Sequence, residues 1–329
     1  IRVRNPADDN DLFVQSTFAT AVSRGIIETF PSGPLPWTTS TLTRMADFGV
    51  NSTTRRYLDT MFVVRSNFNC WAPATSTPQI KLTKAVLLFG DAQPQDVTFT
   101  LAPGAIAAAI AIHPDQTKAA YVQRTPGASA PIHRLRLLNL ADGSDHDLGL
   151  LLPAVQGKTP IAFDRFGNLV VCDGSVLKIL DVTGPAPQVL ATRTLAAPAS
   201  SICFDDALDE VVVLTPTNGR LLRCSKDLAT VIDQPLPTGV PALGDGSVVP
   251  DPTRSGRYPL ITPADALVRE LEIIPGTPRF TLAATLLLPA VQSIQDIQPG
   301  DGGVFVMADG SVRVLDRDPV NGRLRISPT

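Results

Sequence analysis

The stretch Leu150-Leu-Leu-Pro-Ala-Val-Gln156 occurs a second time, letter for letter, at residues 286–292. The offset between the two copies is 136 residues (286 − 150). The same offset holds at a second landmark, because Asp173-Gly-Ser-Val176 returns as Asp309-Gly-Ser-Val312. Two matches at one offset, without a gap between them, are typical of internal repetition. The sequence therefore predicts a repeat protein.

The residues after the first copy form the clearest repeating unit. Short apolar segments follow one another and are separated by Gly, Asp and Pro residues, as expected for strands joined by turns. The segments lie at residues 161–164, 168–172, 176–180 and 188–192. Each is too short for a helix. The pair Asp173-Gly174 between two of them is a hairpin signal, because glycine accepts a positive φ without steric cost.

The same four-segment unit fits four more stretches of the chain. Its copies open at residues 110, 202, 246 and 297, so that consecutive openings, including the one at 161, lie between 41 (202 − 161) and 51 (297 − 246) residues apart. The 136-residue offset then spans three units. Residues 105–329 hold five regular units. Residues 1–104 are predicted to hold two irregular units, with long loops rich in Pro, Ser and Thr at 31–43 and 72–78.

A period of this length with four strands per unit is typical of a β-propeller, in which four-stranded blades pack around a central axis. We therefore expect one all-β domain over residues 1–329, a β-propeller of about seven four-stranded blades, with six or eight as alternatives. In a complete chain, residues 1–4 would lie beside the last blade and fasten the ring. An open β-solenoid would have rungs shorter than about 30 residues. A pair of β-sandwiches would leave the 136-residue offset unexplained.

One unit carries a resemblance to known families. It contains Ile112-His-Pro-Asp115, then Ala120-Tyr-Val122, then Leu135-Arg-Leu-Leu-Asn-Leu-Ala-Asp-Gly143. This order of a Pro-Asp turn, a Tyr-Val strand and a strand ending in a turn with Gly is similar to blades of the broad WD-repeat-like and YVTN-like propeller families. Asn139 stands where those families have Asp. The Gly-His and Trp-Asp pairs of WD repeats are missing, so the resemblance implies a fold and assigns no subfamily.

Composition narrows the classes of function. The net charge is −3, the isoelectric point is near 5.6 and there is no Lys/Arg run, which argues against a nucleic-acid surface. Aromatic residues make up 5%, too few for the stacking platforms that bind carbohydrates or single strands. No apolar segment reaches the roughly 18–20 residues that span a bilayer. We expect a soluble protein whose partners are proteins, and its location does not follow from the sequence.

No cofactor or metal site is expected. Three of the four cysteines lie in apolar runs and are predicted to be buried free thiols; they are Cys172, Cys203 and Cys224. The histidines lack zinc-motif spacing and are predicted to be surface or capping residues; they are His113, His133 and His146. Acidic clusters at residues 205–210 and 251–256 lack the spacing of a calcium loop and are predicted to be solvated turns.

A candidate binding face follows from the topology of a propeller. The connection from the outer strand of one blade to the inner strand of the next lies at a disc face near the channel, and both Pro-Ala-Val-Gln copies fall there. The long N-terminal loops add two tryptophans, which are typical interface anchors. The candidate residues are Gln156, Lys158, Gln292, Asp296, Trp37 and Trp71. The alternative is purely structural, with Pro-Ala-Val shaping a turn and the tryptophans packing between blades.

Two functions from different classes fit these observations. The first is a non-enzymatic scaffold that mediates protein–protein interaction or assembly. One concrete form of it is a structural component of a virus or phage particle, such as a tail or surface appendage. The second is a propeller hydrolase of the lactonase-like type, which rests only on the YVTN-like blade pattern. A screen of lactones with and without divalent metal distinguishes the two.

Overall fold

The computed structural model describes residues 2–4, 11–13, 45–51, 56–65, 79–86, 95–102, 105–115, 117–125, 132–152, 160–215, 217, 219–241, 246–262, 265–274, 279–291, 294–300, 303–308 and 311–326. All regular elements among these residues are β-strands, as the sequence predicts. No described segment forms an apolar helix of membrane-spanning length.

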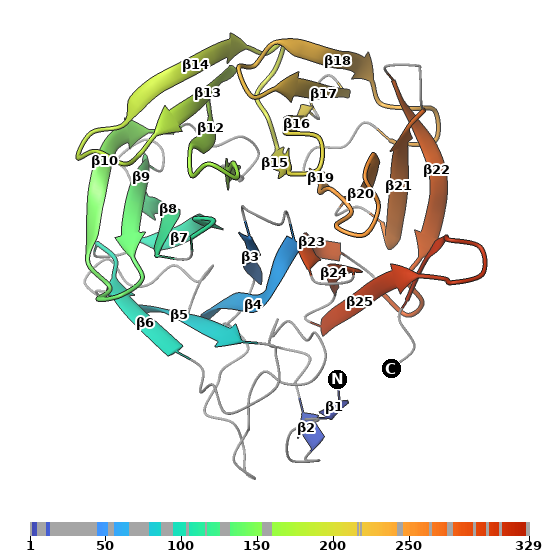
Figure 1. The fold of residues 1–329 in the computed structure, drawn as a ribbon, viewed down its shortest axis with the longest axis horizontal. Coiled ribbons are helices and arrows are strands. Elements are labelled where there is room, and N and C mark those ends of the chain that lie inside the picture. The colour runs from blue at the N-terminus through green and yellow to red at the C-terminus, as the bar shows by residue number, and fades with distance from the viewer. Residues whose placement is uncertain are drawn as a thin grey trace.

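Six four-stranded antiparallel sheets, each built from four consecutive strands, form the blades (Figure 1). Blade 1 consists of β3 (Met45–Asn51), β4 (Arg56–Arg65), β5 (Gln79–Val86) and β6 (Gln95–Thr100). Blade 2 consists of β7 (Ile106–Ile112), β8 (Lys118–Thr125), β9 (Ile132–Asn139) and β10 (Asp145–Leu151). Blade 3 consists of β11 (Ile161–Phe163), β12 (Leu169–Asp173), β13 (Val176–Asp181) and β14 (Gln188–Thr194).

The C-terminal half of the chain repeats this order three times. Blade 4 consists of β15 (Ser201–Asp205), β16 (Glu210–Thr215), β17 (Arg220–Ser225) and β18 (Thr230–Pro235). Blade 5 consists of β19 (Ser247–Val248), β20 (Arg257–Ile261), β21 (Leu267–Ile273) and β22 (Phe280–Leu287). Blade 6 consists of β23 (Ile294–Gly300), β24 (Gly303–Ala308), β25 (Ser311–Arg317) and β26 (Leu324–Ile326).

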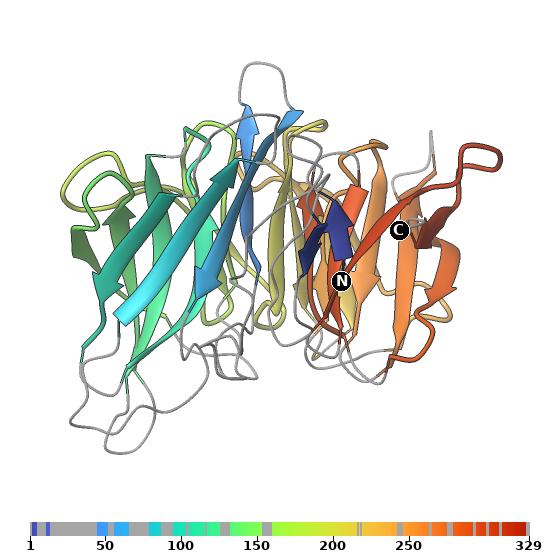
Figure 2. The ribbon, with the colours of Figure 1, turned by 90° about the horizontal axis from the view of Figure 1, so that it is seen from below.

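The blades are arranged as a ring. The inner strands β3, β7, β11, β15, β19 and β23 contact one another in turn, and β23 contacts β3, so the circle is closed. Figure 2 shows the same ring from the side as a disc with strands running between its two faces. The fold is a β-propeller, and the described residues contain six blades, one of the numbers that the sequence left open.

The first residues of the chain lie outside these blades. Strand β1 (Arg2–Arg4) pairs with β2 (Asp11–Phe13) in a separate two-stranded ladder. The last sheet takes its four strands from residues 294–326 alone. The expectation that residues 1–4 fasten the last blade is therefore not met, because the last sheet has a complete set of strands without them.

One strand of blade 1, β3, was not predicted from the sequence pattern. Strand β3 reads Met-Ala-Asp-Phe-Gly-Val-Asn, and Asp, Gly and Asn disfavour strands. Its ladder with β4 contains two register shifts. The strand forms because β4 supplies hydrogen bonds on one side, and because β3 packs between the inner strands β7 and β23 of the neighbouring blades.

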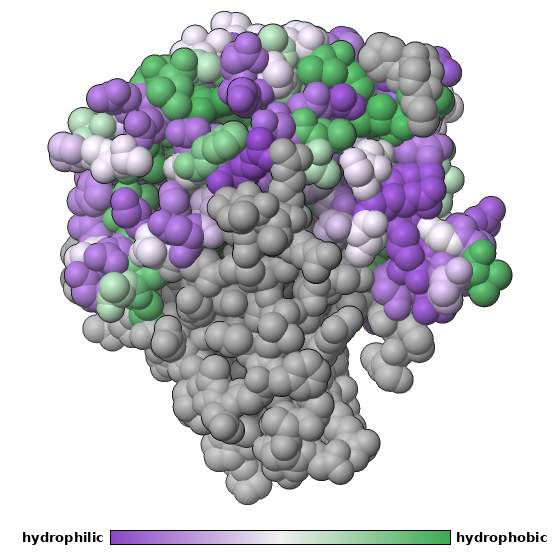
Figure 3. Space-filling view, in the orientation of Figure 1, coloured by the Kyte–Doolittle hydropathy of each residue, from purple (hydrophilic) through white to green (hydrophobic). Residues whose placement is uncertain are grey.

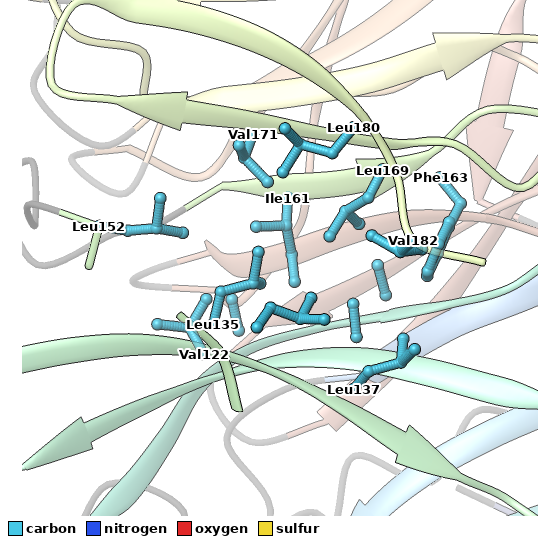
Figure 4. Packing of buried hydrophobic residues seen from close by; sticks show 14 residues of the cluster. Val122, Leu135, Leu137, Leu152, Ile161, Phe163, Leu169, Val171, Leu180 and Val182 are labelled. Carbon is cyan, nitrogen blue, oxygen red and sulfur yellow. The ribbon is translucent and has the colours of Figure 1, made fainter. Parts of the chain in front are cut away.

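The core lies between neighbouring blades. Figure 4 shows the layer in which Val122 and Leu135 of blade 2 meet Ile161 and Leu169 of blade 3, all of them buried. Successive residues of a strand point to opposite faces of the sheet. In β12, Leu169 and Val171 therefore pack toward blade 2, while Val170 packs toward blade 4. This two-sided burial explains the uninterrupted apolar runs of the inner strands.

The outer strand of each blade is the edge of its sheet, so its outer backbone groups have no neighbouring strand among the described residues. Exposed edges invite pairing with other chains, and a bulge that breaks the ladder blunts them. Register shifts occur in β10, β14, β18 and β22. In β10 the shift lies between Asp147 and Leu151 and contains Gly149, whose φ of 74° suits glycine.

The leucines of the two heptapeptide copies occupy equivalent places three blades apart, at the ends of β10 and β22. The third leucine of each copy is buried, and its N–H donates to the start of the third strand of its blade: Leu152 to the His133 carbonyl (2.8 Å) and Leu288 to the Ala266 carbonyl (2.9 Å). The middle leucine points to solvent, with Leu151 57% and Leu287 63% exposed. The leucine run therefore alternates along the edge instead of entering the core as a block.

This alternation predicts different costs for two adjacent substitutions. Leu152→Ala should lower the free energy of unfolding by about 2–5 kcal/mol, because it leaves a cavity between blades 2 and 3. Leu151→Ala, the matched control, should change it by less than about 0.5 kcal/mol. Urea unfolding followed by circular dichroism measures both. Equal losses for the two variants would contradict the placement of the heptapeptide.

Candidate functional site

A cavity of about 110 Å³ lies where the inner strands of several blades meet at the ring axis. Its wall combines apolar side chains such as Ile110 and Val248 with polar ones such as Asp164, Ser200 and Ser201. Ligand pockets usually have volumes of about 300–1,000 Å³. The axial cavity is therefore small for an organic ligand.

The serines that line the cavity are engaged in joining blades. The Ser200 hydroxyl donates to the Gly246 carbonyl at 2.9 Å, and the Ser201 hydroxyl donates to the Val248 carbonyl at 3.2 Å. The Val248 N–H in turn donates to the Ser201 hydroxyl oxygen at 3.1 Å. These bonds connect the inner strands of blades 4 and 5 across a gap that has no regular ladder.

One position recurs at the disc face where each inner strand turns into the second strand. It is occupied by His113, Asp164, Asp205 and Asp251 in blades 2 to 5. The three aspartates are buried, and each caps its own turn. Oxygen Oδ1 accepts the N–H of Phe166 in blade 3 (2.8 Å), of Ala207 in blade 4 (3.0 Å) and of Thr253 in blade 5 (2.8 Å).

The second oxygen of two of these aspartates reaches the next blade. The Tyr258 hydroxyl of blade 5 donates to Asp205 Oδ2 at 2.6 Å. The Arg317 guanidinium of blade 6 pairs with Asp251 and also with Glu270 of blade 5. The sequence predicted solvated turns at residues 205–210 and 251–256. The turns are confirmed and their later residues are partly or fully exposed, but Asp205 and Asp251 themselves are buried. Asp205 and Asp251 are buried because their second oxygen is bonded to a side chain of the neighbouring blade.

His113 fills the same position in blade 2 by packing. Its ring lies edge-on to Phe163 of blade 3, with 5.1 Å between the ring centroids. It also lies against Gly167, where an added Cβ would come within 2.1 Å of Nε2. Gly167 has a φ of 87°, so glycine is required here both by conformation and by space.

Asp164 combines cavity lining with a perturbed acidity. Burial raises the pKa of its carboxyl group, and hydrogen bonds from Asn168 and from the backbone oppose this rise. Oδ1 accepts the N–H groups of Phe166 and Asn168 at 2.8 Å, and Oδ2 accepts the Asn168 side-chain amide at 2.7 Å. A carboxyl with both oxygens committed to its own turn is suited to holding that turn.

The predicted thiols are where the sequence placed them. Cys172, Cys203 and Cys224 are buried thiols outside any disulfide, and Cys70 lies outside the described residues. Burial raises the pKa of the Cys224 thiol to about 11, which disfavours the thiolate that redox or nucleophilic chemistry needs. Within the part of the chain that the structure describes, no three His, Cys, Asp or Glu side chains gather as metal ligands.

The residues predicted to form a binding face are not tested by the structure. Gln156, Lys158, Gln292, Trp37 and Trp71 lie outside the described residues. Asp296 belongs to β23, where its backbone pairs with Met307, and its side chain is not described. The binding role of these six residues stays a prediction.

An exposed aromatic residue that the sequence analysis did not single out stands on the disc face of the recurring turns, hereafter the turn face. Phe166 follows Asp164 in the β11–β12 loop and is 57% exposed. The Arg165 guanidinium lies 4.6 Å from its ring centroid, and the Lys226 ammonium of blade 4 lies 5.7 Å away. Arg165 is held by Asp209 at 2.9 Å. The available signal was a phenylalanine in the short connection between the predicted strands at residues 161–164 and 168–172.

Apolar side chains are also exposed on the rim. Val189 and Leu190 in β14 are 54% and 55% exposed, because a bulge turns two consecutive residues outward. Figure 3 shows hydrophobic groups gathered along the upper rim, over β14 and β18, while hydrophilic side chains dominate nearer the centre. The described surface therefore offers apolar contacts both on the rim and on the turn face.

Comparisons with known proteins support the fold. No protein-family model matches the chain, and no curated protein sequence matches it. A solved putative 6-phosphogluconolactonase from Bacteroides uniformis is similar at a TM-score of 0.55 and 13% identity, over 85% of this chain and 90% of that one. A protein of unknown function from Bacteroides thetaiotaomicron is similar at 0.51 and 12% identity, over 83% and 68%. At these identities the likeness shows the propeller fold alone.

The pairing at Arg317 yields a stability prediction. Arg317→Met should lower the free energy of unfolding by about 3–5 kcal/mol, because it leaves Asp251 and Glu270 as buried charges without their main partner. Arg325→Met should leave it nearly unchanged, since the Arg325–Asp316 pair is partly exposed and belongs to one blade. Urea unfolding of both variants provides the measurement. A small loss for Arg317→Met would show that the joint between blades 5 and 6 does not depend on it.

Proposed function

We propose that this β-propeller is a non-enzymatic scaffold that binds partner proteins through a face of its disc, as part of a larger assembly. The observation that carries the proposal is Phe166, an exposed ring on the turn face bracketed by two cations from neighbouring blades. A particle of the virus or phage type is one form that such an assembly takes, and it remains part of the proposal.

The local chemistry suits an interaction anchor. Interface hot spots are enriched in aromatic residues and arginine. Arg165 is ordered in advance by its 2.9 Å pair with Asp209, so little side-chain freedom is lost when a partner contacts it. The turn beneath Phe166 is fixed by Asp164 and Asn168. A partner with an apolar side chain for the ring and a carboxylate for the cations would complement this site.

The lactonase-like hydrolase is supported only by the blade pattern and by Asp164, a cavity-lining carboxyl with a raised pKa. The scaffold reading is favoured because both oxygens of Asp164 already serve its own turn. The six residues predicted from the sequence remain a second proposed contact surface; they are Gln156, Lys158, Gln292, Asp296, Trp37 and Trp71.

Affinity capture from the source organism tests the scaffold. Phe166→Ala should reduce recovery of the bound partner about tenfold or more, the effect of losing an interface hot spot. Val320→Ala is the matched control, because Val320 is 92% exposed in the β25–β26 loop on the same face, distant from the cation pair. It should leave recovery unchanged.

The outcomes separate the two surfaces. Loss with Trp37→Ala or Trp71→Ala, and not with Phe166→Ala, would move the interface to the N-terminal loops. Full recovery with all three variants would contradict the proposal that either surface binds the partner. Circular dichroism of each variant confirms that the blades remain folded.

A further inference from the structure

A second cavity, of about 320 Å³, opens between the outer parts of blades 2 and 3, far along the radius from the axial cavity. It lies on the turn face, beside the β9–β10 and β13–β14 loops. Its wall consists of Lys118, Leu137, Asn139, Ser144, His146, Val182, Thr183, Gly184 and Pro185. None of these residues takes part in the site proposed above.

Strand register explains why the polar residues of this cleft face the same way. Lys118 of β8 is the direct partner of Asn139 in β9, and His146 of β10 is the direct partner of Leu137 in β9. Directly paired residues share a face of the sheet, as do residues two apart on one strand. Lys118, Asn139 and His146 therefore stand on one side of blade 2, the side that meets blade 3.

The floor of the cleft is apolar. Leu137 and Val182 are buried and belong to the core layer between the two blades (Figure 4). The polar residues stand where this layer ends at the turn face. A charge-assisted hydrogen bond is stronger beside an apolar floor than in open water, because less solvent screens it.

The hydroxyl groups and acidic side chains around the cleft are already matched to one another. The Ser144 hydroxyl donates to Asp142 Oδ1, and the Thr183 hydroxyl donates to Asp181 Oδ1, both at 2.6 Å. The Asn139 side-chain oxygen accepts the Ala141 N–H at 2.9 Å. The amide nitrogen of Asn139 is left as a donor.

The side chains of Lys118 and His146 have no hydrogen bond or ion pair to any residue that the structure describes. The cleft thus collects an ammonium, an imidazole and an amide N–H₂ group, all of which donate, around a space large enough for a small molecule. We propose that this cleft binds a compact oxyanion, a carboxylate or phosphate group, held by Lys118, His146 and Asn139.

Nuclear magnetic resonance of ¹³C-labelled histidine tests the proposal, because the chain has three histidines and one of them lines the cleft. Titration with inorganic phosphate or with succinate, at constant pH and ionic strength, should shift the His146 ring signals saturably. The His113 and His133 signals should stay in place and also report that the fold is intact. A response to phosphate alone or to succinate alone identifies the preferred oxyanion, and either supports the site.

Charge-matched variants complete the test. Lys118→Met should raise the dissociation constant of the oxyanion about tenfold or more, because it removes one charge-assisted hydrogen bond. Arg279→Met removes the same charge from an exposed position in blade 5, outside both the cleft and the Phe166 site, and should leave the dissociation constant within about twofold. An equal shift of His146 with sodium chloride, no saturation with either oxyanion, or equal effects of the two variants would overturn the proposal.

Discussion

The apolar faces of the four-stranded sheets impose the constraint on which the rest of the structure depends. Each sheet has two such faces, and a single blade can cover neither. In β12 the alternation sends Leu169 to one neighbouring blade and Val170 to the other, so the strand is buried only when both neighbours are present. The closed contact of inner strands from β3 round to β23 satisfies this need for every described blade.

Polar groups at the edges of these layers reinforce the closure with different chemistry at three of the joints between blades. A tyrosine hydroxyl meets Asp205 between blades 4 and 5, a guanidinium meets Asp251 between blades 5 and 6, and a histidine ring meets Phe163 between blades 2 and 3. Buried polar groups are tolerated because they have partners. The blades thus share a position at the end of the inner strand, but the side chain at this position differs between them.

Both proposals rest on surface loops that are anchored to this frame. The turn that presents Phe166 is anchored by Asp164, and the cleft beside Lys118 begins where the apolar layer of Leu137 and Val182 ends. Both features lie on the turn face and both join residues of two blades. Both proposed sites therefore lie at boundaries between blades.

Repetition in the sequence was sufficient to establish the propeller, the strands of residues 105–326 and the buried thiols, because strand alternation and turn residues are local signals. The sequence pattern did not predict β3, because its Asp, Gly and Asn disfavour a strand. They form one through the pairing with β4 and the contacts with β7 and β23. The sequence pattern also could not foresee that Asp205 and Asp251 are buried, that Phe166 stands between Arg165 and Lys226, or that Lys118 and His146 share a cleft. Those facts depend on which strands and blades lie side by side, and only the tertiary structure decides that. Lys118 and His146 are 28 residues apart in the chain (146 − 118), Phe166 and Lys226 are 60 apart (226 − 166), and Asp251 and Arg317 are 66 apart (317 − 251).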